Sequence, residues 1–133
     1  MFYKKKLKKE EIFSHFEVYD NIYSLHTLEH IQDISDFLTS LQKNTKSGTM
    51  IYFSVPNFES SARYTKDIFA SDGEFIHVND FPALAPHEHF WHFSVDTFKN
   101  LILTKLDNCR IIQIDTNSIW QEDEQIDIVL EII

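Results

Sequence analysis

The densest group of side chains that could do chemistry is the histidine-rich, aromatic segment HEHFWH, residues 87–92. His87, His89 and His92 could offer imidazole nitrogens to zinc, copper or nickel, and two of them would share one face of an extended segment. The same histidines could instead pack among the aromatic rings, or one could act as a general base toward a hydroxyl group. Because spacing alone does not fix ligand geometry in a loop, no metal site is assigned from the sequence.

A second polar group follows the first predicted strand and contains His26, Thr27, Glu29 and His30. Open α/β sheets bind ligands beyond the carboxyl ends of their strands, where the connecting loops diverge, so this group is well placed for ligand contact. A structural interpretation competes with it. Glu29 could simply begin a helix, where the positive end of the helix dipole favours a carboxylate, while His30 packs or caps.

The glycine content excludes one class of binding site. The chain has two glycines, Gly48 and Gly73, where average usage would give about nine. Dinucleotide and phosphate loops need several glycines within a few residues, because backbone amides must approach the ligand closely. This sequence therefore contains neither a G-x-G-x-x-G loop nor a Walker loop.

The bulk composition is that of one soluble globular domain of 133 residues. A net charge of −9 argues against non-specific nucleic-acid binding, and the lysines of segment 4–9 are expected to form a solvated terminal face. The single Cys109 excludes an intramolecular disulfide and is expected to be a buried thiol. We find no apolar stretch long enough to span a bilayer and no apolar signal-peptide core, so a cytoplasmic location is expected, with no membrane partner.

Hydrophobic periodicity predicts an α/β domain. The predicted strands are 19–25, which should be buried, 50–55, 109–115 and 126–133, with the polar stretch 116–125 as a loose, solvated hairpin tip. The predicted helices are 27–41 and 95–106, the second capped by Ser94, with a less regular helix at 4–16 and a helical turn at 62–69.

The stretch DNIYSLHTLEHIQDISDFLTSLQKNTKSGTMIYFSVPN, residues 20–57, resembles the second half of a class I S-adenosylmethionine (SAM) dependent methyltransferase of the type 11/23 kind. SLHTLEHI and the later glycine followed by VPN carry the resemblance, which extends over residues 19–133. It implies a partial Rossmann-like sheet of about four strands, the last pair antiparallel, with helices packed on it.

The same resemblance implies roles for individual residues. In family members the residues after this strand contact the methionine portion of SAM, which corresponds here to Leu25, His26 and Thr27. The histidine-rich segment helps to form the acceptor pocket, which corresponds to His87, His89 and His92. No catalytic residue can be assigned. The family's glycine-rich loop and ribose-binding acid have no counterpart in residues 1–18, so SAM is the implied cofactor but the isolated chain is expected to bind it very weakly.

We therefore expect one truncated methyltransferase-like domain: an N-terminal segment (1–18), a strand–helix–strand unit (19–57), a substrate-loop-like region (58–93) and a helix with a C-terminal hairpin (94–133). Completed by a longer form or a partner, it would methylate a small-molecule acceptor. The alternative is a non-catalytic oligomerisation or interaction domain. Strand 19–25 would become an edge and one sheet face would be uncovered, which favours a homo-oligomer or a partner protein.

Overall fold

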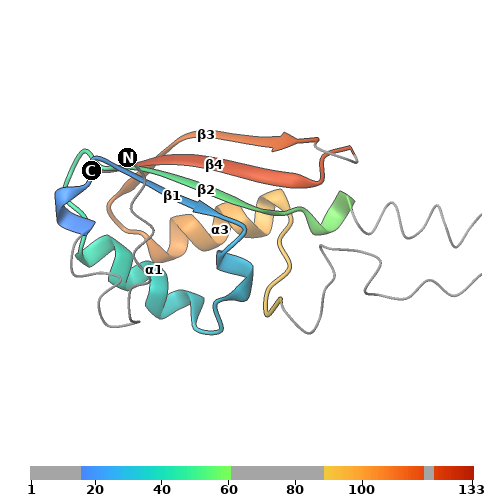
Figure 1. Cartoon of the computed structure of the whole chain (residues 1–133), viewed down its shortest axis with the longest axis horizontal. Coiled ribbons are helices and arrows are strands. Elements are labelled where there is room, and N and C mark those ends of the chain that lie inside the picture. The colour runs from blue at the N-terminus through green and yellow to red at the C-terminus, as the bar shows by residue number, and fades with distance from the viewer. Residues whose placement is uncertain (1–15, 61–88, 119–121) are drawn as a thin grey trace, which may run out of the picture.

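The computed structural model describes residues 16–60, 89–118 and 122–133, which form a four-stranded mixed sheet with helices on one face (Figure 1). The strands lie in the order β1-β2-β4-β3, with β1 parallel to β2 and β4 antiparallel to both of its neighbours. Their bounds are Asn21–Leu25 (β1), Met50–Pro56 (β2), Cys109–Asn117 (β3) and Gln125–Ile132 (β4). The predicted α/β class is confirmed, including the antiparallel final pair.

The helices α1 (Ile34–Lys43) and α3 (Val95–Lys105) lie side by side against one face of the sheet (Figure 1). Alternate residues of β2 and β4 point toward them, as the twofold period of a strand requires. Together they form one apolar core, made of Leu28, Ile34, Leu38, Leu41, Ile51, Phe53, Val55, Phe93, Phe98, Ile102, Leu106, Ile126, Ile128, Leu130 and Ile132. Within the described ranges no helix covers the other face of the sheet.

The predicted helix at 27–41 is wrong in its first half. The chain forms a single 3₁₀ turn, η3 (Leu28–His30), takes an extended conformation at Ile31, and begins α1 only after Asp33. The Asp33 carboxylate accepts the Asp36 amide at 3.1 Å and caps the new start. In a continuous helix the Ile31 carbonyl would accept a backbone amide. In the structure it accepts the Trp91 indole N–H at 2.7 Å.

The second helix begins as predicted. The Ser94 side chain accepts the Thr97 amide at 3.2 Å, and the Thr97 hydroxyl accepts the Ser94 amide at 2.8 Å. This reciprocal pair satisfies two amides that have no partner inside the helix. The helix is thereby fixed at the end nearest the carboxyl ends of β1 and β2.

Two expectations about burial are wrong. No residue of β1 is buried, and the Tyr23 side chain is 71% exposed, because β1 is paired only with β2 in the described part of the chain and its outer face is open. Cys109 is half-buried, not fully buried. Its thiol donates to Leu106 O at 3.4 Å, and partial burial raises its pKa.

Several predictions fall outside the described residues: the lysines of 4–9, the helical turn 62–69, His87 and most of helix 4–16. Phe16 alone of that helix is described, and it begins the short 3₁₀ turn η2 (Phe16–Val18). Among the helices that the structure describes, none is both long and apolar enough to cross a membrane.

Candidate functional site at the carboxyl edge of the sheet

The chain leaves β1 through an unusual backbone turn at His26. Its φ is +47°, the left-handed region that histidine visits more readily than most residues. The turn is held from both sides, because the His26 amide donates to Ser54 O at 2.9 Å and the Thr27 hydroxyl donates to Leu25 O at 3.0 Å. The side chains of Leu25, His26 and Thr27 are all exposed at this edge.

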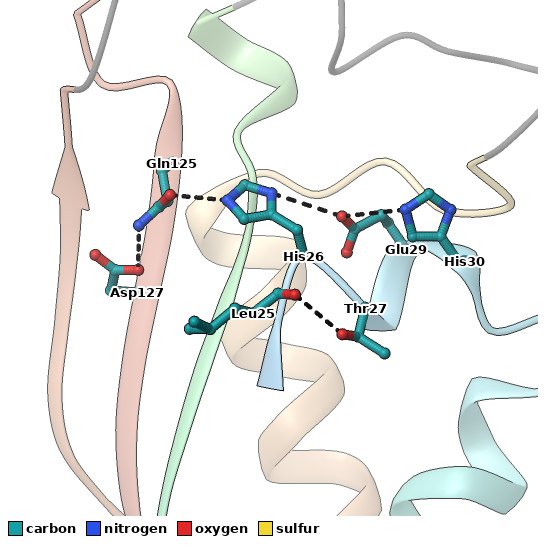
Figure 2. Close-up of polar contacts among 7 residues, drawn as sticks. All are labelled: Leu25, His26, Thr27, Glu29, His30, Gln125 and Asp127. Carbon is teal, nitrogen blue, oxygen red and sulfur yellow. Dashed lines mark hydrogen bonds and ion pairs between the residues drawn. The ribbon is translucent and has the colours of Figure 1, made fainter. Parts of the chain in front are cut away.

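A hydrogen-bonded chain of side chains runs from this turn across the sheet (Figure 2). His26 Nε2 donates to Gln125 Oε1 at 2.8 Å, and Gln125 Nε2 donates to Asp127 Oδ1 at 2.9 Å. Asn117 Nδ2 donates to the other carboxylate oxygen of Asp127. The His26 ring is therefore oriented by residues at the start of β4 and the end of β3, about a hundred positions later in the sequence.

Glu29 lies beside the turn and is 1% exposed. Its Oε1 is 3.7 Å from His26 Nδ1 and 3.7 Å from His30 Nε2, which are ion-pair distances when the imidazoles are protonated. Neither carboxylate oxygen accepts a hydrogen bond from any residue in the described ranges. A buried carboxylate without hydrogen bonds is costly, so the environment of Glu29 calls for a functional explanation.

Hydrogen bonds hold the segment that precedes α3 against η3, the turn that contains Glu29. The amides of Phe90 and Trp91 donate to Glu29 O at 2.8 and 3.3 Å. These contacts bring the His89 ring to 4.7 Å from that of His30, centroid to centroid, with the ring planes at 77°. The structure thus joins His89 to the polar group that follows β1, a pairing that the sequence did not predict because the residues are far apart in the chain.

The other predicted pocket histidines lie differently. The His92 ring is 5.6 Å from the Phe58 ring and 6.2 Å from the His89 ring, centroid to centroid. His92 therefore lies beside the end of β2, while His89 lies beside η3. His87 is not among the described residues, so its predicted place in the pocket stays a prediction.

The acidic stretch 122–124, predicted to be a solvated hairpin tip, is attached to the end of β2 through its main chain. The Asn57 amide and its Nδ2 donate to Glu124 O and Asp123 O, each at 2.8 Å. The Ser60 hydroxyl donates to Glu122 O at 2.6 Å. The sequence offered one signal of this contact, the asparagine of the VPN string, because Asn57 directly follows a predicted strand.

Tyr52 lies on the open face of the sheet beside Asp127. Partial burial and the adjacent Asp127 carboxylate, which accepts the phenol hydrogen and repels a phenolate, together raise its pKa to about 12. The raised pKa means that the folded chain holds this proton more tightly than the unfolded chain does.

We therefore expect the free energy of unfolding to keep its Tyr52 contribution below pH 10 and to lose it as the pH rises toward 12. Ultraviolet titration of tyrosinate should show one late-titrating phenol that is missing in Tyr52→Phe. Asp127→Asn should move that phenol toward pH 10, the ordinary tyrosine value. If both variants titrate like the wild type, the Tyr52–Asp127 contact is not the cause of the late-titrating phenol.

Comparison with known proteins agrees with this architecture. A family model described as a methyltransferase domain matches residues 4–105. A putative SAM-dependent methyltransferase from Listeria monocytogenes aligns with a TM-score of 0.56 at 18% identity, over 93% of this chain and 66% of that one. A SAM-dependent methyltransferase from Clostridium acetobutylicum ATCC 824 aligns with a TM-score of 0.53 at 10% identity, over 86% and 58%.

A third structure, an O-methyltransferase family 2 protein from Planctomyces limnophilus DSM 3776 in complex with apigenin, aligns with a TM-score of 0.51 at 10% identity, over 86% of this chain and 30% of that one. Identities this low show the fold alone, and the chain spans less than two thirds of each of these structures. No curated protein matches the sequence. The family model covers more than half of the chain, and the chain therefore belongs to the methyltransferase domain family.

Proposed function

We propose that this chain is the acceptor-side part of a SAM-dependent methyltransferase and that a longer form or a partner chain supplies the part that binds adenosine. Bound SAM carries a methyl group on a positively charged sulfur, and its transfer to an oxygen, nitrogen or carbon nucleophile leaves S-adenosylhomocysteine and a proton. In this proposal His26 and Thr27 face the methionine portion of SAM, while His89 and His92 face a small acceptor.

The observation that carries this proposal is the turn at His26. A histidine in the left-handed region, fixed by Ser54 O and oriented by Gln125, lies where open α/β sheets bind their ligands. Backbone conformations of this kind are retained where the surrounding structure holds them, and they concentrate at functional sites. A ring held in this way is preorganised to contact a cofactor.

The position of Gly48 supports the proposal of a second part. Gly48, the one glycine among the described residues, has φ +87° and donates to Ile132 O at 2.7 Å, at the amino end of β2. That end is the edge opposite the candidate site. It cannot bring backbone amides to a cofactor bound near His26, so we infer that these amides come from elsewhere.

The test uses this chain joined to a cofactor-binding segment. The chain is extended at its amino end with a methyltransferase segment that carries a glycine-rich loop and an acidic ribose ligand, and S-adenosylhomocysteine is titrated into it by calorimetry. We expect saturable binding that His26→Ala weakens by about tenfold, the equivalent of one lost hydrogen bond to a charged ligand. Lys43→Ala, on the exposed end of α1, is the matched control and should bind normally. An extended chain that folds but does not bind would refute the proposal.

A second candidate function is a non-catalytic interaction domain, which the exposed edge of the sheet favours. Tyr23 and Leu25 on β1 are 71% and 58% exposed, and in the described part of the chain β1 has a free edge. A second copy could add its own β1 antiparallel to the first around a twofold axis and cover these side chains in both subunits. Under this hypothesis the chain is a homodimer.

Light scattering decides between a dimer and a monomer of 15.8 kDa. The dimer hypothesis expects Tyr23→Lys to give the monomer mass, because a buried lysine in the new interface would be unpaired. Ile112→Lys is the matched control, since Ile112 is 49% exposed but lies on β3, the opposite edge strand. A monodisperse wild-type monomer would exclude the homodimer.

A further inference from the structure

We propose that this chain binds one divalent first-row transition-metal ion through Glu29, His30 and His89. One carboxylate oxygen and two imidazole nitrogens of these residues all lie within 4.8 Å of one another. The inference does not depend on SAM, because the proposed function uses only His89 of these three residues, on the acceptor side, and assigns no metal ion.

The Glu29 carboxylate gives the first argument. It is 1% exposed and accepts no hydrogen bond within the described ranges, yet its Oε1 is 3.7 Å from His30 Nε2. That distance is too long for a hydrogen bond. It is close to the separation of two ligands on one ion, because tetrahedral zinc ligands at about 2.1 Å from the metal lie about 3.4 Å apart. An ion at this point would neutralise the buried charge.

The fixed position of His89 gives the second argument. Glu29 O accepts two amides of the His89 segment, from Phe90 and Trp91, and Ile31 O accepts the Trp91 indole N–H. Three hydrogen bonds from successive residues therefore hold this segment against η3. The third ligand is placed by contacts that do not involve the ion, so little ordering remains to be done when the ion binds.

The donor set indicates the class of ion. Two neutral imidazoles and one carboxylate form the ligand set of open zinc sites, and imidazole nitrogens also suit iron, nickel and copper. The His30 side chain is 41% exposed, so water or an oxygen donor can reach a remaining coordination position. Figure 2 shows His26 on the opposite side of the Glu29 carboxylate from His30, and the ligand atoms that lie within 4.8 Å of one another do not include a nitrogen of His26. We therefore do not count His26 as a ligand.

This ligand set differs from the one that the histidine-rich segment offers. His89 belongs to both sets, but His92 lies beside Phe58, and Glu29 and His30 come from another part of the chain. Substitution of His30 or His92 therefore separates a site built by the fold from a cluster of neighbouring histidines.

The experiment uses the tag-free chain after removal of metal with a chelator. Zn²⁺ is titrated in competition with a chromophoric chelator, and Co²⁺ serves as a spectroscopic probe through its visible absorption. We expect one Zn²⁺ per chain. His30→Ala and His89→Ala should each weaken binding by at least about 100-fold, since loss of even an outer partner of a metal ligand costs about 10- to 100-fold. His92→Ala is the matched control and should bind within about threefold of the wild type.

Thermal unfolding provides a second readout that does not depend on comparing affinities. Zn²⁺ should raise the Tm of the wild type and of His92→Ala, because an ion that binds only the folded chain stabilises it. It should not raise the Tm of His30→Ala. Absence of saturable 1:1 binding would overturn the proposal. So would binding that survives both His30→Ala and His89→Ala, or binding that is lost only in His92→Ala.

Discussion

Phe98→Ala is expected to lower the free energy of unfolding by about 3–5 kcal/mol. Phe98 is fully buried on the sheet-facing side of α3. Its ring centroid lies 5.0 Å from that of Phe93 and 6.4 Å from that of Phe53 in β2. The substitution removes a large side chain and both aromatic contacts, and it leaves a cavity between the helix and the sheet that the packed core cannot refill.

Urea denaturation followed by circular dichroism measures this loss, with an unchanged m-value showing that the transition is the same one. Leu103→Ala is the matched control on the same helix, where Leu103 is 50% exposed, and should change the free energy by no more than about 0.5 kcal/mol. Equal losses in the two variants would mean that α3 does not pack on the sheet through Phe98.

The second large effect has the opposite sign. Glu29→Met is expected to raise the free energy of unfolding of the metal-free protein by about 1–2 kcal/mol. The carboxylate is buried, accepts no hydrogen bond from the described residues, and has imidazoles no closer than 3.7 Å. Methionine fills a similar volume without a charge to desolvate. A buried side chain that lowers stability in this way is expected to have a functional role.

Denaturation in the presence of a chelator measures this gain. Glu29→Gln is the control for charge alone, since it keeps a polar group in the buried position and should gain less than Glu29→Met. A fall in stability for Glu29→Met would show that the carboxylate holds the turn together, and it would remove the reason to seek a ligand there.

The sequence predicted the elements whose signals are local. Strands β2, β3 and β4, the Ser94 cap and helix α3 follow from twofold or helical periodicity and from capping chemistry, and all lie within a few residues of the expected bounds. The helix at 27–41 was wrong because its first turn is decided by amides and an indole from residues 90 and 91. A contact between segments so far apart leaves no periodic signal.

The residues of the candidate site divide in the same way, into those with a local sequence signal and those that meet only in the folded chain. Leu25, His26 and Thr27 could be placed at the carboxyl edge, because the end of a strand can be located from its pattern. Gln125 and Asp127, which orient His26, could not, because their role depends on β4 lying between β2 and β3. The Glu29–His30–His89 cluster was missed for the same reason: its members meet only in the folded chain.

The central claim is that this chain supplies the acceptor side of the reaction and obtains its cofactor loop from elsewhere. Calorimetric titration of S-adenosylhomocysteine into the purified 133-residue chain tests it most directly. The claim predicts no saturable heat at millimolar ligand, since the two glycines of the sequence, Gly48 and Gly73, are too far apart along the chain to form a glycine-rich loop. One-to-one binding with a Kd of about 1 μM, or about −8 kcal/mol, would contradict it.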